Sequence, residues 1–319
     1  MEKPTYKVII PIVAKDLYLI KNNITYFQNN LGIKSLVFIG NKTIEKECLQ
    51  IPNSEFIDED LVVPGLTFKK CQELISTRCG NTQRTGWYFQ QFLKIGYSII
   101  CKEDYYLVWD SDTIPIQKIE FFDKENKAFL STKKYVKYDN CYSESISAIF
   151  QNKISKSKDY SFIAEHMMFN KELTLELISY IEKNNQIKGD TFFEKIINSI
   201  PLRIINLSGF SEFETYASFL MLLHPNTYKL REWNNIRCGK IFIGPNPSTD
   251  LLQWVSKRFA SISIERYDSY WIIFKFFNKA KTFKYIKFNY VYNIFIPLIE
   301  IIYTIRLCLR NIIKPILKH

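Results

Sequence analysis

The stretch that most constrains the fold is Tyr105–Trp109, five consecutive apolar or aromatic residues that run into Asp110-Ser111-Asp112. Such a run, preceded by charged residues and stopped by Pro115, predicts a strand buried on both faces of a mostly parallel sheet. In open α/β sheets the ligand crevice lies beyond the carboxyl ends of the strands. Because alternate residues of an extended chain project to the same side, the two aspartates can share one divalent ion or divide between an ion and a ligand hydroxyl.

The tripeptide Asp-x-Asp is a weak signal by itself, since a chain of 319 residues holds about one copy by chance. A second copy, Asp58-Glu59-Asp60, lies in an acidic stretch closed by Pro64-Gly65, and we predict that it is a solvated loop. The apolar strand before Asp110 distinguishes the first copy. We interpret that copy as a metal site, with a polar strand end as the alternative.

Composition limits the class of protein. With 319 residues and 47% hydrophobic content, the chain can bury a large core, and one domain of about 250 residues with an appendage fits this length. Seven cysteines without a C-x-x-C pair, and three histidines, argue against a zinc site or a disulfide framework. No glycine-rich dinucleotide or Walker A motif is present, and the first residues predict no secretory signal, so we expect a cytoplasmic setting.

The positive charge is concentrated at the C-terminal end. Residues 252–319 carry 12 Lys or Arg and three Asp or Glu, whereas the preceding 251 residues carry 31 and 29, so most of the net charge of +11 belongs to this tail. Apolar residues recur at helical spacing from Val291 to Ile316 with charged residues between them. This pattern is a poor transmembrane span and a good interfacial helix.

We therefore predict two parts: a nearly neutral domain over residues 1–250 and a basic amphipathic helical tail over residues 251–319. The tail is expected to lie on an anionic membrane surface. The alternative is a helix packed on the body or on a second subunit, which would give a homo-oligomer. Nucleic acid is not expected as a partner, because no RNA-binding motif accompanies the basic residues.

The first half of the chain predicts a βαβ unit followed by two helices. Strands at Val8–Ile12 and Ser35–Ile39 flank a helix that starts at Leu17. Thr67 is predicted to cap a helix over 68–78 that Gly80 ends. A further helix over 84–97 places Gln91 and Lys94 on one polar face, which we interpret as facing a bound diphosphate or, alternatively, solvent.

Carboxylates within apolar segments supply the remaining candidates. Glu165 and His166 lie inside a strongly apolar run, where polar groups need partners. Ser211 and Glu214 form a predicted capping box, which gives Glu214 a structural role and leaves Glu212 as the candidate catalytic base. The run Lys240–Ile243 is predicted to be a last strand.

Four blocks together resemble a little-characterised family of bacterial glycosyltransferase-like proteins associated with surface polysaccharide synthesis. The blocks are Arg84-x-Gly86-Trp87-Tyr88-x-Gln90-Gln91-x-Leu93-Lys94, Asp110-Ser111-Asp112-Thr113, Glu165-His166-Met167-Met168-Phe169 and Ser211-Glu212-Phe213-Glu214-x-Tyr216. The resemblance covers residues 5 to 245. It implies a GT-A-like nucleotide-sugar transferase, with a mostly parallel sheet flanked by helices, that moves a hexosyl or related group in capsule or lipopolysaccharide synthesis.

The resemblance also implies roles for individual residues. Asp110 and Asp112 would bind Mn²⁺ or Mg²⁺, with His224 as a third ligand or His166 in its place. Glu212 would be the base of an inverting enzyme, whereas Glu165 or Glu212 would orient the acceptor in a retaining one; His166 and Glu214 would support the acceptor. The residues expected to bind the nucleotide-sugar donor are Pro11, Ile12, Val13, Asp16, Arg84, Gln91, Lys94, Asp110 and Ser111. The acceptor would be a saccharide or a lipid-linked saccharide, at the inner face of the cell membrane.

Two alternatives remain open at this point. A magnesium-dependent phosphatase or phosphotransferase of the haloacid dehalogenase type also places Asp-x-Asp after an apolar strand. The motif of that type has Thr or Val at the position where this chain has Ile114. The other alternative is a non-catalytic, membrane-associated scaffold that uses a degenerate transferase fold.

Overall fold

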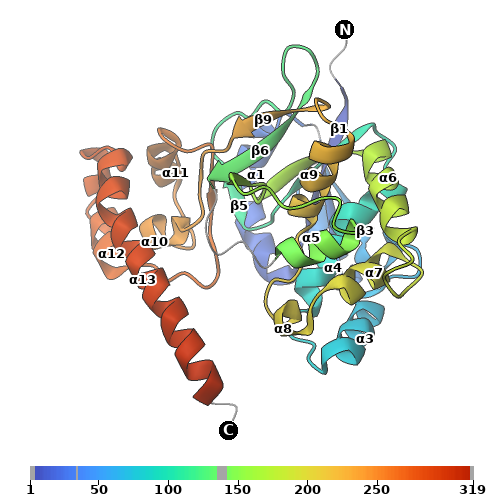
Figure 1. The fold of residues 1–319 in the computed structure, drawn as a ribbon. Coiled ribbons are helices and arrows are strands. Elements are labelled where there is room, and N and C mark those ends of the chain that lie inside the picture. Colours follow the sequence, from blue (N-terminus) through green and yellow to red (C-terminus); the bar gives the residue numbers. More distant parts are fainter. Residues whose placement is uncertain (1–3, 34, 135–141, 317–319) are drawn as a thin grey trace.

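A five-stranded sheet forms the centre of the computed structural model, which describes residues 4–33, 35–134 and 142–316 (Figure 1). Its strand order is β3-β2-β1-β4-β8, and four of the five strands run parallel. Strand β8 pairs antiparallel with β4, so that Trp109 lies opposite His166. The strands are β1 (Tyr6–Pro11), β2 (Leu36–Gly40), β3 (Ser54–Asp58), β4 (Tyr105–Trp109) and β8 (His166–Asn170). The predicted mostly parallel α/β sheet is confirmed.

Alternate residues of these strands enter two separate cores, which is why the apolar runs are continuous. Ile9 and Val108 belong to the core on one face, and Val8 and Leu107 belong to the core on the other. The first face is covered by α3 (Phe68–Cys79), α4 (Thr85–Gly96), α5 (Ser143–Ile149), α6 (Lys171–Glu182), α7 (Phe192–Ser199), α8 (Leu202–Ile205) and α9 (Glu212–Leu223). The second face is covered by α1 (Leu17–Asn30), α2 (Glu45–Leu49) and the C-terminal elements.

Two small sheets extend the molecule. One contains β10 (Asn235–Ile236), β11 (Ser261–Ser263) and β5 (Thr113–Pro115); the other contains β7 (Tyr160–Ser161), β6 (Ala128–Lys134) and β9 (Tyr228–Glu232). Ser263 pairs with Thr113, and the Ile264 N–H donates to the Asp112 carbonyl at 2.8 Å. Residues after position 250 are therefore attached to the segment that carries the two aspartates.

The predicted strand at Lys240–Ile243 is wrong, because these residues form the short helix α10 (Gly239–Ile243). Ile241, Phe242 and Ile243 are all buried, so the run shows no alternation that separates a strand from a buried helical turn. Gly239 lies directly against β11: a Cβ atom there would stand 2.2 Å from the Ile262 side chain. The absence of a side chain lets α10 pack on that strand.

The acidic stretch around residue 58 also differs from its prediction. Asp58 ends the edge strand β3, and Glu59 begins a 3-10 turn, so the segment is a strand end and not a loop alone. The predicted N-cap at Thr67 is confirmed, since its side chain accepts the Lys70 N–H, and Gly80 ends that helix in the left-handed region. The 3-10 turns are Ala14–Asp16, Lys42–Ile44, Glu59–Leu61, Tyr97–Ile99 and Thr282–Lys284.

The C-terminal helices α10, α11 (Thr249–Ser256), α12 (Ile272–Lys279) and α13 (Phe288–Ile316) gather at one side of the molecule, coloured orange to red in Figure 1. Phe274, Phe288 and Ile299 are buried in the second core, so these helices pack on the body. No helix in the described ranges combines the length and hydropathy that a membrane crossing needs. The boundary at residue 250 stays a prediction, and residues 317–319 of the predicted tail lie outside the described part.

Candidate functional site

A cavity of about 410 Å³ opens at the carboxyl end of β1. Five of the residues predicted to bind a donor line it, namely Pro11, Ile12, Val13, Asp16 and Ser111. The opposite wall comes from α3 and α4, where the Phe68 and Phe89 rings meet edge to face at 5.5 Å. The cavity therefore combines aromatic walls with a few polar groups, which suits a planar ring with polar edges.

Two further hollows adjoin this cavity and share Lys15 and Asp16 with it. One, of about 240 Å³, is lined by Asp110, Ser111, Asp112 and the segment Glu265–Tyr267. The other, of about 250 Å³, is lined by Asp112, Lys240 and Arg266. We call the three hollows together the cleft. It follows the carboxyl ends of the parallel strands, as predicted from the sequence.

Asp112 occupies the most acidic part of the cleft. Burial, followed by repulsion from Glu265, Asp110 and Glu165, raises the pKa of Asp112 from 3.8 to about 8. A partly buried carboxyl group surrounded by other carboxylates is stabilised when a cation binds beside it. Carboxylate oxygens are also ligands that Mg²⁺ and Mn²⁺ accept.

The described residues alone do not complete a metal site. Within the described ranges, no group of three His, Cys, Asp or Glu side chains is arranged to hold a metal ion. Asp110 and Asp112 fit a hard divalent ion that takes its other ligands from substrate phosphates and water, as Mg²⁺ commonly does.

Lys94 links Asp110 to Glu212 behind the cleft. Its Nζ donates to Asp110 Oδ1 and to Glu212 Oε1, each at 2.7 Å, and the Lys94 side chain is 5% exposed. Burial alone would lower the pKa of Lys94, but the two carboxylates raise it above its ordinary value. Lys94 is therefore a buried ammonium group that fixes the position of Asp110.

The predicted catalytic role of Glu212 does not fit its place in the structure. Its side chain is buried beside Lys94, and burial raises the pKa of Glu212 while Lys94 lowers it. The Glu212 N–H donates to Gln91 Oε1 at 3.1 Å, so the start of α9 is fixed to α4. With its side chain 5% exposed and its carboxylate held by Lys94, Glu212 is suited to a positioning role.

The donor-facing side of α4 is also corrected. Gln91 and Lys94 point into the core, whereas Gly86, Trp87, Gln90 and Leu93 line the cleft. Arg84 occupies the N-cap position of this helix without a side-chain capping bond. Its guanidinium lies 4.4 Å from the Trp87 ring centre and donates a hydrogen bond to the Ser208 hydroxyl. Of the polar side chains on α4, Gln90 is the one that reaches two of the hollows.

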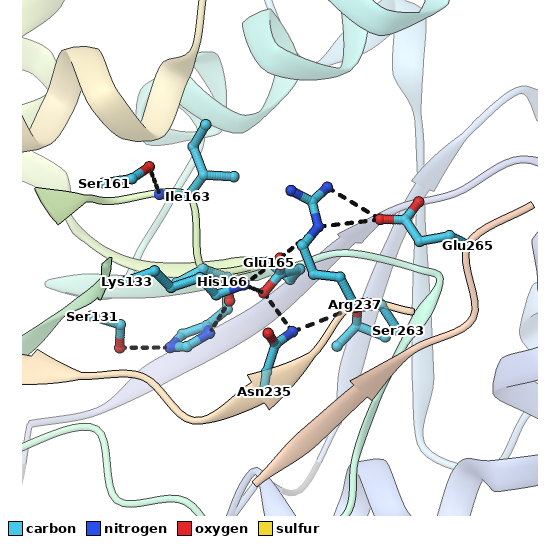
Figure 2. A network of polar contacts seen from close by, with 12 residues as sticks. Ser131, Lys133, Ser161, Ile163, Glu165, His166, Asn235, Arg237, Ser263 and Glu265 are labelled. Carbon is cyan, nitrogen blue, oxygen red and sulfur yellow. Dashed lines mark hydrogen bonds and ion pairs between the residues drawn. The ribbon is translucent and has the colours of Figure 1, made fainter. Parts of the chain in front are cut away.

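Glu165 is the centre of a polar network at the rim of the acidic region (Figure 2). Its carboxylate accepts hydrogen bonds from Lys133 at 2.6 Å and from Asn235 at 2.6 Å, and it pairs with Arg237 at 3.2 Å. Arg237 also pairs with Glu265, so it lies between two carboxylates.

The Glu165 backbone contributes as well. Glu165 adopts φ of 60°, an uncommon value for a residue other than glycine, and its carbonyl accepts the Asp110 N–H at 3.0 Å. With three donors on its carboxylate, Glu165 is suited to hold Lys133, Asn235 and Arg237 together. It is poorly placed to accept a proton from a substrate.

Three more residues predicted to belong to the site, His166, Glu214 and His224, lie away from the cleft. His166 is buried between Ser131 Oγ at 3.0 Å and the Ala164 carbonyl at 2.9 Å, and burial holds its pKa well below the ordinary value. It is therefore a neutral core residue. The Glu214 carboxylate accepts hydrogen bonds from the Ser161 hydroxyl and the Phe162 N–H. The Ser211 hydroxyl accepts the Glu214 N–H, which is one half of the predicted capping box. The other half, a bond from the Ser211 N–H to the Glu214 side chain, is absent from the contacts described for Glu214.

His224 follows the last residue of α9, 12 residues after Glu212. A helix of that length separates its ends by about 18 Å. The His224 ring lies 3.1 Å from Glu176 on α6. The structure therefore does not place His224 with Asp110 and Asp112, and its predicted role as a metal ligand does not fit.

Several cleft residues were missed from the sequence. Glu59 lines the 410 Å³ cavity, and it follows β3 directly, in the same way that Asp110 follows β4. The position of Glu59 directly after a strand is the sequence feature that could have predicted its place in the cleft. Lys240, Glu265, Arg266 and Tyr267 come from segments interpreted as a strand and a tail, and no local pattern marked them.

Glu59→Gln is expected to change stability in a pH-dependent way. Burial raises the Glu59 pKa from 4.5 to about 7. A hydrogen bond from Asn41 lowers this pKa, and repulsion from Asp60 and Asp58 raises it. Since the folded-state pKa is above the unfolded one, the contribution of Glu59 is complete below pH about 4.5 and is lost as pH rises through about 7. The free energy of unfolding of the variant should equal that of wild type at pH 5. At pH 8 it should be higher by roughly 1 kcal/mol, a figure reduced for solvent screening. Chemical denaturation at the two pH values measures this effect, and an equal difference at both would contradict it.

Together, the fold and the cleft define an α/β protein with a candidate ligand site at the carboxyl edge of a mostly parallel sheet, lined by aromatic, acidic and basic side chains. The chain belongs to a family of unknown function, DUF6492, whose model matches residues 25–280. No curated protein sequence matches it.

Solved structures similar to this chain include three glycosyltransferases. The bifunctional glycosyltransferase WbbM is 12% identical with a TM-score of 0.39, and the similarity covers 84% of this chain and 47% of WbbM. Mouse xyloside xylosyltransferase 1 is 10% identical (TM-score 0.40; 83% of this chain, 99% of that one). The galactosyltransferase LgtC, solved with donor and acceptor sugar analogs, is 12% identical (TM-score 0.41; 86% and 95%). This chain thus spans about half the length of WbbM.

Proposed function

We propose that this chain is a metal-dependent glycosyltransferase that takes a hexosyl or related sugar from a nucleotide-sugar donor. The observation that supports it is the order of the cleft: an aromatic cavity, then Asp110 and Asp112, then basic side chains. A nucleotide sugar presents a planar base, which suits the aromatic cavity, and a charged diphosphate, which suits a metal ion on Asp110 and Asp112 together with the basic side chains. The acceptor is proposed to be a saccharide or a lipid-linked saccharide of a bacterial surface polysaccharide, as the sequence resemblance implies.

Asp110 and Asp112 would hold the ion through carboxylate oxygens. When bound there, Mn²⁺ or Mg²⁺ would stabilise negative charge on the departing diphosphate. Lys94 fixes one Asp110 oxygen and the Glu165 carbonyl fixes the Asp110 N–H, so the loop between β4 and β5 is held from both sides. Such preorganisation lowers the cost of binding charge at the reacting centre.

The assay that tests this function follows release of nucleoside diphosphate from a panel of sugar nucleotides, with Mn²⁺ and without acceptor. A glycosyltransferase is expected to hydrolyse its donor slowly under these conditions. Release of phosphate from small phosphoesters, lost in Asp110→Ala, would instead support the phosphatase alternative. Absence of turnover with every donor would favour the non-catalytic scaffold.

The tail is proposed to hold the protein at the inner face of the cell membrane. Large apolar side chains of α12 and α13 face solvent in the described part, with exposed fractions of 69% for Ile272, 67% for Phe276 and 70% for Ile294. Five lysines of residues 275–287 are exposed beside them, and Glu300 is the one acidic residue between positions 272 and 305. Apolar side chains ringed by lysines suit an anionic bilayer, since each lysine contributes about 1 kcal/mol near such a surface.

The variant Ile294→Glu is expected to release the protein from vesicles of anionic lipid in a sedimentation assay. The substitution places a charge on a side chain that would enter the bilayer, while the buried contacts of Phe288 and Ile299 with the body stay intact. Leu49→Glu, which charges an apolar side chain 53% exposed on α2, is the matched control and should sediment like wild type.

Sedimentation that is the same for all three proteins would refute membrane binding through this face. A change in molecular mass of Ile294→Glu in solution would favour the second-subunit alternative.

A further inference from the structure

The third hollow of the cleft gathers three cationic side chains from distant parts of the chain. Lys15, Lys240 and Arg266 line this space of about 250 Å³ together with Asp112. Asp16 is the other carboxylate at its border. None of the three cations forms an ion pair with a carboxylate of the described residues, although Lys15 and Arg266 both attract the Asp16 carboxylate. The three cations outnumber the two carboxylates, Asp16 and Asp112, that line the hollow.

The fold fixes these side chains at one place. Lys15 lies in the 3-10 turn that follows β1. Gly239 packs against β11, which sets the start of α10, and the Lys240 Nζ donates to the Arg266 carbonyl at 3.1 Å. The hydrogen bond from the Ile264 N–H to the Asp112 carbonyl then ties the segment before Arg266 to the acidic region.

We propose that this hollow binds the diphosphate group of the nucleotide donor, an inference that rests on the function proposed above. The cations outnumber the carboxylates in this hollow, and Lys and Arg side chains are common partners of phosphate oxygens in proteins. Because the three hollows share Lys15 and Asp16, a ligand whose base lies in the 410 Å³ cavity has its phosphates beside Asp112 and these cations.

The arrangement also gives the cations a role in the reaction. Negative charge accumulates on the diphosphate as it departs from the sugar, and nearby ammonium and guanidinium groups stabilise that charge. Asp112 would hold the metal ion, and Lys240 and Arg266 would contact the phosphates in the same hollow. Neither cation was expected to take part from the sequence.

Binding of a nucleoside and of its diphosphate, measured by calorimetry, tests the inference. The probe is the member of a panel of UDP, GDP, CDP and ADP that wild type binds, together with the matching nucleoside and Mn²⁺. Lys240→Ala and Arg266→Ala should each weaken diphosphate binding by roughly tenfold, as expected for a lost charge-assisted contact. Nucleoside binding should change by less than about twofold, because the base lies in the aromatic cavity.

Lys183→Ala, which removes an exposed lysine after α6, is the matched control and should bind both probes as wild type does. Lys240→Arg and Arg266→Lys should recover most of the lost affinity. Unchanged diphosphate binding in both alanine variants, or an equal loss for nucleoside and diphosphate, would overturn the subsite and leave the proposed function standing. Failure of wild type to bind any nucleotide would overturn both.

Discussion

Asp112→Ala is expected to abolish metal-dependent nucleotide binding and to lower sugar transfer by at least about a hundredfold, the cost of removing a main electrostatic contact to the reacting groups. Burial, followed by repulsion from Glu265 and Asp110, raises the pKa of Asp112 to about 8. The substitution removes one of the two carboxylates that would hold the ion. Calorimetry with the preferred nucleotide, with Mn²⁺ and with chelator, measures the change.

The fold should survive this substitution, because Asp112 has no ion pair among the described residues and its removal relieves repulsion with Asp110 and Glu265. We therefore expect a thermal midpoint equal to or above that of wild type without metal. Asp159→Ala, at an exposed position before β7, is the control and should bind as wild type does. Retained metal-dependent binding in Asp112→Ala would contradict the site assignment.

Lys94→Met is expected to lower the free energy of unfolding by about 3–5 kcal/mol. The substitution keeps an unbranched side chain of similar length but leaves Asp110 and Glu212 without their shared cation. Both carboxylates lie 2.7 Å from the Lys94 Nζ, and Glu212 is buried. Urea denaturation monitored by circular dichroism measures the loss.

The double variant Lys94→Met with Glu212→Gln separates charge from packing. Because Gln carries no charge, the second substitution removes the buried carboxylate that the first leaves without a partner, so the double variant should be more stable than Lys94→Met alone. If Glu212→Gln instead adds its own destabilisation to that of Lys94→Met, the ion-pair interpretation is wrong.

The position of the cleft could be predicted from the sequence because it depends on a strong local pattern. Tyr105–Trp109 is apolar throughout and ends in Asp110, and β1 shows a similar run before its loop. Parallel strands bring such ends to one edge of the sheet, so the sequence alone predicts that Pro11 and Asp110 lie near each other.

The orientation of α4 could not be predicted in the same way. Adjacent residues on a helix differ by about 100° in direction. Gln90 and Gln91 are chemically identical, and α4 is apolar on several faces because it packs against both the sheet and α9. The contact that decides between them is the hydrogen bond from Glu212, 121 residues later in the chain.

The contribution of the C-terminal segment to the cleft could not be predicted from the sequence for a similar reason. Strand β11 has three residues, and its pairing with β5 joins positions about 150 apart. No periodicity in so short a strand identifies its partner. Arg266 and Tyr267 therefore looked like part of a basic tail, whereas their place in the cleft follows from a non-local pairing.

A metal-dependent nucleotide site is tested most directly by thermal unfolding of the wild-type protein with UDP, GDP, CMP and their common sugar conjugates, each with Mn²⁺ and with chelator. A ligand at a hundred times its dissociation constant stabilises the folded state by about 2.7 kcal/mol, which corresponds to several degrees. We predict a shift with one nucleotide class that chelator removes. No shift with any nucleotide, or the same shift with and without metal, would contradict the proposed site.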